Sequence, residues 1–284
     1  MDGYWAPVAV GAVAAPRRRP RSRLVVLLCL LTLTVAVGAV ASHRAAASGD
    51  GTVITVEQPA SAAAGWGPTY VDERGRPARW DPCRPIGFVV QAGWIPDAGR
   101  RDLAEALRRL SAASGLRFVD EGETDELPSR ARAAFQPERY GERWAPLLIG
   151  WVPPDSTDLA IGDGTQGVAV AVAVPNRDGP SLVTGQVVLD ATRRLASGFG
   201  AGTTDGEVLL HELTHAVGLG HVLDPTQVMY PQTTNSESQF GAGDRAGLAA
   251  LGAPAGCHPA PRARPLRMEP WAPPACHLPP RTRR

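Results

Sequence analysis

The fold of this chain is decided by residues 204–221, which read Thr-Asp-Gly-Glu-Val-Leu-Leu-His-Glu-Leu-Thr-His-Ala-Val-Gly-Leu-Gly-His. Thr204, followed three positions later by Glu207, has the pattern of a capping box that starts a helix. Apolar residues then recur at helical spacing and would form one buried stripe, made of Leu209, Leu213 and Ala216. The segment therefore predicts a helix whose histidines lie opposite the buried stripe.

Three histidines in this segment have the spacing of ligands to a single metal ion. His211 and His215 are four residues apart, so their rings project from one face of the helix. A continuous helix would carry His221 away from them, because six further residues turn the chain by about 240°. Glycine enters the left-handed conformation without steric cost, so Gly218 can end the helix. We therefore expect a helix break at Gly218 that brings His221 back to the other two histidines.

The residue types indicate a catalytic zinc site. Three imidazoles leave a fourth zinc position for water, whereas a structural site has four protein ligands. Glu212, next to the first ligand, would be the general base that activates this water for attack on a peptide carbonyl. Chance would produce these five fixed residues roughly once in a hundred thousand chains of this composition. We therefore expect one Zn2+ held by His211, His215 and His221.

The same residues, H-E-x-x-H-x-x-G-x-x-H, together with Val228-Met-Tyr-Pro231, resemble the metzincin clan of zinc peptidases and its matrixin-like group. The resemblance implies that Met229 forms the Met-turn beneath the zinc and that residues 243–252 form the short helix that closes the domain. It also implies an α+β fold, with a twisted mixed sheet of about five strands, an active-site helix and a small irregular C-terminal subdomain ending in a helix.

Some features depart from the matrixin pattern. Residues 43–65 contain no cysteine that could keep a proenzyme latent and are too short for a folded prodomain. Cys83 could act as such a latency switch, but this alternative is less favoured, because Cys83 lies just before the first expected strand. No histidine lies between His43 and His211, so a second, structural zinc is not expected. Residues 231–233 lack the tyrosine usual in matrixins, so matrixin substrate preferences do not carry over.

The remaining elements are predicted by hydrophobic runs. Strands are expected at 86–90, 116–119, 147–152, 168–174 and 186–189. A helix is expected between the first two strands, with Asp97 as its N-cap and Gly115 at its end. The family likeness implies that strand 168–174 is an edge strand that aligns an extended substrate. Residues 153–167 form a loop for which a solvated turn is favoured over Ca2+ binding, although it contains Asp155, Asp158 and Asp163.

The N-terminal region has a membrane-targeting pattern. Five arginines lie between Arg17 and Arg23, and residues 24–41 contain no charge. The small residues of Ala39-Val-Ala41 favour signal cleavage, while the long segment before the arginines favours a retained anchor, which we place slightly ahead. In either case the chain after Ser42 is exported. The protein is expected at the cell membrane, as a single-pass protein with its catalytic domain outside, or secreted.

These patterns divide the chain into five parts. They are a cytoplasmic basic segment (1–23), a transmembrane anchor or signal-peptide core (24–42), a linker (43–65), a catalytic domain (66–253) and a disordered Pro/Arg-rich tail (254–284). Binding of the basic tail to anionic wall or lipid surfaces is the alternative to a merely solvated tail.

Export permits disulfides, and the exported part contains Cys83, Cys257 and Cys276. We favour a bridge between Cys83 and Cys257, and a bridge between Cys257 and Cys276 is the competing pairing. The formal net charge is only +1, so nothing indicates a nucleic-acid partner. The expected partners are protein or peptide substrates and, through the N-terminal segment, the membrane, and a monomer is expected.

Together these observations predict an extracytoplasmic zinc-dependent metalloendopeptidase. The alternative is a non-catalytic, zinc-stabilised adhesion or cell-wall-binding module. Glu212 favours the enzyme, because a structural zinc site does not need a base.

Overall fold

The computed structural model describes residues 52–55, 65–200, 202–232 and 239–267. The expected basic segment (1–23) and anchor or signal core (24–42) lie outside these residues and stay predictions. Within the described ranges, no helix combines the length and the apolar character needed to cross a membrane.

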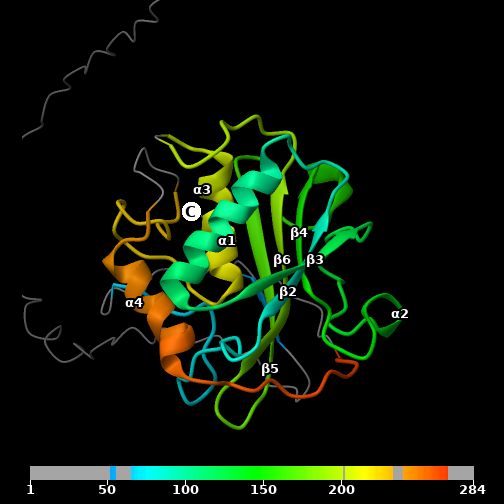
Figure 1. Cartoon of the computed structure of the whole chain (residues 1–284), viewed down its shortest axis with the longest axis vertical. Coiled ribbons are helices and arrows are strands. Elements are labelled where there is room, and N and C mark those ends of the chain that lie inside the picture. Colours follow the sequence, from blue (N-terminus) through cyan, green and yellow to red (C-terminus); the bar gives the residue numbers. More distant parts are fainter. Residues whose placement is uncertain (1–51, 56–64, 201, 233–238, 268–284) are drawn as a thin grey trace, which may run out of the picture. The chain divides into compact units, whose positions relative to one another are not determined.

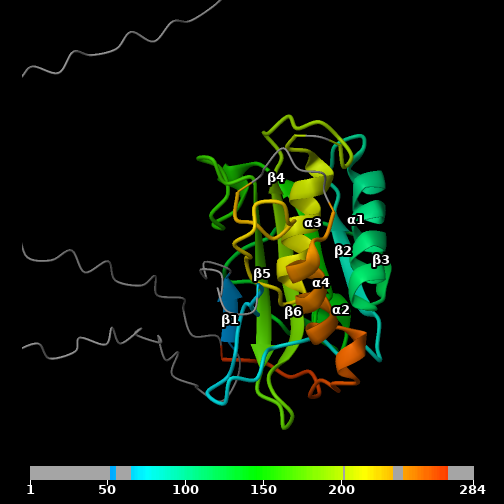
Figure 2. The ribbon, with the colours of Figure 1, turned by 90° about the vertical axis from the view of Figure 1, so that its left-hand side faces the viewer.

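A mixed sheet of six strands is the centre of the domain (Figures 1 and 2). The strand order is β1-β5-β6-β4-β2-β3. Strands β2, β3, β4 and β6 run parallel to one another, while β5 is antiparallel to both β6 and β1. The bounds are Thr52–Thr55 for β1, Ile86–Gln91 for β2, Phe118–Thr124 for β3, Leu147–Val152 for β4, Gly167–Val174 for β5 and Ser181–Asp190 for β6.

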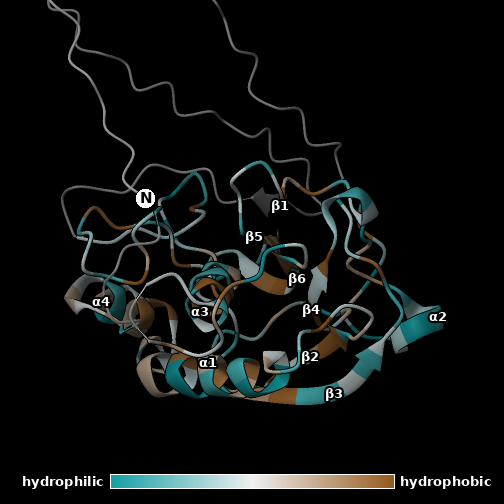
Figure 3. Ribbon diagram, turned by 90° about the horizontal axis from the view of Figure 1, so that it is seen from above, coloured by the Kyte–Doolittle hydropathy of each residue, from teal (hydrophilic) through white to brown (hydrophobic). Residues whose placement is uncertain are grey.

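The three longer helices lie along one face of this sheet (Figures 2 and 3). Helix α1 spans Gly99–Ser114, α3 spans Asp205–Ala216 and α4 spans Ala242–Leu251. A four-residue helix, α2, spans Pro137–Tyr140, and two short 3-10 turns, η1 and η2, span Pro154–Ser156 and Ala253–Ala255. Figure 3 shows that β2 and β6 are largely hydrophobic, whereas much of α1 is hydrophilic.

The main core fills the space between α1, α3 and the sheet. Strand β5 shows how the sequence divides the two faces, because side chains alternate along a strand. Its alanines (Ala169, Ala171 and Ala173) join the core shared with the helices. Its valines point the other way, and Val172 and Val174 belong to a smaller apolar cluster. The small alanines let α3 approach the sheet closely, which sets the position of the helix that carries the histidines.

The expected fold class is confirmed, and all five expected strands are present; β4 has the expected bounds, and the other four are longer or shifted. The structure adds β1, which lies inside the range 43–65 expected to be a linker. The expected N-cap at Asp97 is wrong, because Ala98 occupies that position without a side-chain bond. Pro96 O accepts a hydrogen bond from Gly99 N, and this turn starts the helix after Ala98.

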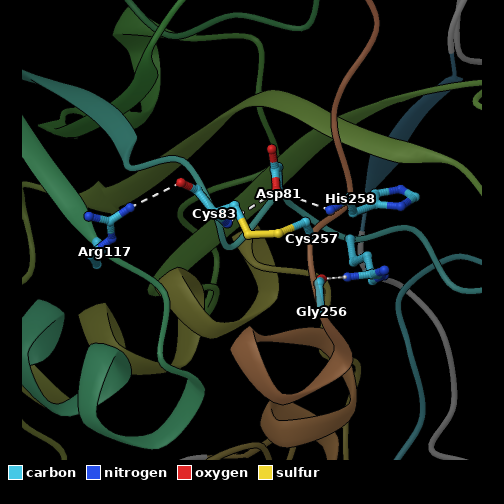
Figure 4. The surroundings of a disulfide bond; sticks show 7 residues. Asp81, Cys83, Arg117, Gly256, Cys257 and His258 are labelled. Carbon is cyan, nitrogen blue, oxygen red and sulfur yellow. Dashed lines mark hydrogen bonds between the residues drawn. A yellow bond between two sulfur atoms is a disulfide. The ribbon is translucent and has the colours of Figure 1, made fainter.

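Residues 254–267, expected to be disordered, have defined positions against the domain. A disulfide joins Cys257 to Cys83, which is the pairing favoured from the sequence (Figure 4). Beyond it, His258 is buried and donates its backbone N–H to the carboxylate of Asp81. Side chains of the domain donate hydrogen bonds to the carbonyls of Gly256, Pro259 and Pro261. A segment too poor in apolar residues to form its own core is thus ordered by partners distant in sequence.

Candidate metal centre

Helix α3 presents two of the three histidines. Thr204 is its N-cap, and the Thr204 hydroxyl accepts a hydrogen bond from Glu207 N at 3.2 Å. The expected stripe of Leu209, Leu213 and Ala216 is fully buried against the sheet. Because this stripe fixes the rotation of the helix about its axis, His211 and His215 project together on another face.

The helix ends where the sequence predicted a break. Its last residue is Ala216, and Gly218 has a φ of +103°, a conformation that favours glycine. Trp80 Nε1 donates a hydrogen bond of 2.9 Å to Ala216 O, which satisfies a carbonyl of the last turn. The chain then reverses direction, and the His221 ring centroid lies 4.6 Å from that of His215 and 5.4 Å from that of His211. The structure therefore brings together the three predicted ligands.

Backbone carbonyls orient two of the three rings. His211 Nδ1 lies 2.7 Å from Val228 O, and His215 Nδ1 lies 2.7 Å from Leu219 O. A carbonyl only accepts hydrogen bonds, so both Nδ1 atoms carry the proton and both Nε2 atoms present a lone pair. Burial, the largest influence, lowers the pKa of His211 to about 4 and that of His215 well below its usual value. Both rings are thus held neutral, as a metal ligand must be.

The lone pairs converge on a position that fits a zinc ion. His215 Nε2 lies 3.1 Å from His221 Nε2, and one ligand atom from each of the three histidines lies within 4.8 Å of the others. Two ligands of a tetrahedral zinc at 2.0–2.1 Å lie roughly 3.3 Å apart, close to the observed separation. The donor set and its geometry therefore fit one zinc ion with an open fourth position.

Glu212 follows His211 on α3, and its side chain lies against the start of β5. Its side chain is 8% exposed, and burial raises the pKa of its carboxyl to about 8. The first residue of β5, Gly167, is in contact with it. A Cβ added at Gly167 would lie 2.8 Å from Glu212 Cγ and 3.2 Å from Glu212 Oε1. The absence of a side chain at Gly167 therefore leaves the space that the Glu212 carboxylate occupies.

The segment after His221 returns beneath the site and is held by α4. Met229 is fully buried, and its carbonyl accepts a hydrogen bond of 2.8 Å from Val222 N. The Asp244 carboxylate is also fully buried and accepts hydrogen bonds from Val228 N at 3.0 Å, Gly241 N at 3.0 Å and Met229 N at 3.4 Å. Val228 O orients His211, and Asp244 binds the backbone N–H groups on both sides of that carbonyl, so Asp244 supports the metal centre through the backbone of Val228 and Met229.

Sequence reasoning missed Asp244 and the carbonyls of Leu219 and Val228. The spacing of Gly241 and Asp244 is that of an N-cap followed by an acidic residue at the third helical position, which indicates a helix start. That pattern carries no information on the contact with Val228, because Asp244 lies 16 residues further along the chain.

The loop at residues 153–167 gives no support for calcium binding. The described ranges contain two clusters of at least three metal-ligating side chains. Neither cluster contains Asp155, Asp158 or Asp163. The second cluster consists of Asp81, Cys83 and Cys257, whose two thiols are joined in the disulfide.

A protein-family model matches the part of the chain that carries the metal centre. Residues 96–251 match the family model described as matrixin, which covers more than half of the chain. No curated protein matches the chain. The matched range includes α1, β3, β4, the three histidines and α4, whereas β2 lies before it. The same family model therefore covers both most of the fold and the whole metal centre.

Proposed function

The chain belongs to the matrixin family of zinc metallopeptidases, and on this premise we propose that it is an extracytoplasmic endopeptidase with Glu212 as its general base. One observation carries the proposal. The Nε2 atoms of His215 and His221 converge, carbonyls fix the His211 and His215 rings, and the residue that follows His211 on α3, Glu212, carries a buried carboxyl group.

A zinc ion held by the three histidines would polarise the peptide carbonyl and favour ionisation of water. The chain's own residues would supply the remaining steps. Glu212 would take a proton from the attacking water on a carboxylate oxygen and pass it to the nitrogen of the leaving amine. The carbonyls of Val228 and Leu219 would keep the ligand rings from rotating during both proton transfers.

The sheet would align the substrate. An extended peptide can add to the free edge of a strand through backbone hydrogen bonds. Strand β5 is not the edge strand expected from the sequence, because β1 pairs with it at Val170–Ala173. A peptide paired near Gly167, with the edge of β5 that faces away from β6, would pass the catalytic carboxylate. This placement supports the cleavage of bonds within extended segments of protein or peptide chains.

The disulfide supports an extracytoplasmic location. A bond between Cys83 and Cys257 persists in oxidising compartments and is rare in the cytosol. We propose that the domain lies outside the membrane, either anchored by residues 24–42 or released. The size of the native protein in membrane and medium fractions tests this point, and a protein found only in the medium and starting at Ser42 would contradict the anchor.

The activity is tested by comparing the full chain with its Glu212→Gln variant, which keeps the side-chain shape but removes the base. We expect one zinc ion per chain in both proteins by metal analysis. We expect cleavage of a mixed peptide library by the wild type, and a rate lower by at least about a hundredfold in the variant. A wild type that binds one zinc but cleaves nothing that the variant leaves intact would favour the adhesion or wall-binding module instead.

A further inference from the structure

Strand β1 covers the edge of β5 that the proposed function assigns to the substrate (Figure 2). It pairs antiparallel with β5, with Thr52 opposite Ala173 and Thr55 opposite Val170. The other edge of β5 is occupied along its length by β6. A strand has two hydrogen-bonding edges, so no edge of β5 is left over at these four positions.

The position of the catalytic carboxyl group defines where a substrate would lie along β5. Gly167 contacts Glu212, and Val170 lies three residues further along the strand, about 10 Å away at 3.4 Å per residue. Strand β1 therefore lies to one side of the carboxyl group and runs toward it, because its last residue, Thr55, pairs nearest to Gly167.

A substrate paired antiparallel with β5 would run in the same direction as β1. If one of its residues lies opposite Gly167, the residues three to six positions upstream lie opposite Val170 to Ala173. These are the positions that β1 occupies. A long substrate and β1 therefore compete for the same backbone groups, whereas a substrate with only two upstream residues does not reach them.

We propose that β1 is an intramolecular competitor of long substrates and must leave the edge of β5 before their upstream residues bind. This inference rests on the proposed function of the same site. The inference gives β1 an autoinhibitory role. This role does not depend on a cysteine, since residues 43–65 contain none. The competition depends on backbone pairing and acts on substrates according to how far they extend upstream of the cleaved bond.

The test uses the full chain and two fluorogenic peptides that share one cleavable sequence from the library, with eight residues or two residues upstream of the cleaved bond. The variant Val53→Pro/Ile54→Pro removes two adjacent backbone N–H groups from β1, because proline has none. Hydrogen-bonded pairs alternate along an antiparallel strand, so one of these two donors faces β5 whichever way β1 is turned. The variant Ala46→Pro/Ala47→Pro places two prolines before β1 and is the matched control.

We expect the KM for the long peptide to be about tenfold lower in Val53→Pro/Ile54→Pro than in the wild type and the control, which corresponds to about 1.4 kcal/mol. The KM for the short peptide should agree within about twofold in all three proteins. A decrease of equal size for both peptides, or no decrease for either, would overturn the proposal.

A binding measurement separates this inference from the proposed function. The same proline variants are made in the Glu212→Gln background, and the Kd for a labelled long peptide is measured by fluorescence anisotropy. A Kd about tenfold lower in Val53→Pro/Ile54→Pro supports the competition, even if the wild type cleaves nothing and the endopeptidase proposal fails. An unchanged Kd contradicts the competition, even if the wild type is an active enzyme.

Discussion

Replacing Asp244 tests whether α4 supports the metal centre through the backbone of Val228 and Met229. In Asp244→Ala, the N–H groups of Val228, Gly241 and Met229 lose a buried acceptor. The two bonds of 3.0 Å dominate, since the Met229 bond is long at 3.4 Å. A buried donor without a partner costs about 1–3 kcal/mol, so we expect the free energy of unfolding to fall by about 4 kcal/mol.

Asp244→Asn is the matched variant, because its amide oxygen can take the place of Oδ2. That atom accepts both bonds of 3.0 Å, from Val228 and Gly241. The amide nitrogen would face Met229 N, which removes only the longest bond. Burial raises the pKa of Asp244, so losing the charge also removes a desolvation cost. We therefore expect the asparagine variant to lose only about 1 kcal/mol of stability.

The two variants should also differ in zinc affinity. Val228 O orients His211, and loss of such an outer contact typically weakens metal binding by about 10–100-fold. We expect this loss for Asp244→Ala and a change below about threefold for Asp244→Asn. Urea unfolding followed by circular dichroism gives the stability, and competition with a chromophoric chelator gives the zinc affinity. Zinc affinity of Asp244→Ala equal to that of the wild type would refute the proposed support of His211 by Asp244.

Three further predictions follow from the contacts of the domain. Gly167→Val should lower kcat at least about tenfold at unchanged zinc content, because the new valine side chain would collide with Glu212. The control Gly200→Val should retain the wild-type kcat, because a Cβ at that position has open space around it. Replacing both cysteines of the disulfide, which are separated by 174 residues, with alanine should lower the free energy of unfolding by about 2–5 kcal/mol and lower Tm, as thermal unfolding will show. Burial raises the pKa of Glu126, but its buried arginine partner and hydrogen bonds outweigh this effect and hold it below the usual value. The ionised Glu126 carboxylate therefore stabilises the fold fully above a pH of about 4.5, and this stabilisation is lost as the pH falls through the lower folded-state pKa. The difference in free energy of unfolding between the wild type and Glu126→Gln should shrink over that range. A difference that does not change with pH would contradict this prediction.

The sequence alone determined the local part of the metal centre. The cap at Thr204, the buried stripe and the break at Gly218 depend on residues within one or two helical turns. Helical periodicity places His211 and His215 on one face of α3, and the break at Gly218 lets the chain bring His221 back to them. The strands β2, β4, β5 and β6 were also predictable, because each contains a short hydrophobic run. Strand β3 was predicted only near its start, since the residues after Val119 are polar, and β1 was not predicted.

Only the tertiary structure decided which distant groups meet this centre. The carbonyl of Val228, the carboxylate of Asp244 and the bare backbone of Gly167 reach the site from separate elements. The pairing of β1 with β5 and the ordering of residues 254–267 likewise join segments far apart in sequence. Spacing along the chain cannot predict these contacts, because they arise when separate elements bury their apolar faces on one sheet and their remaining polar groups find partners there.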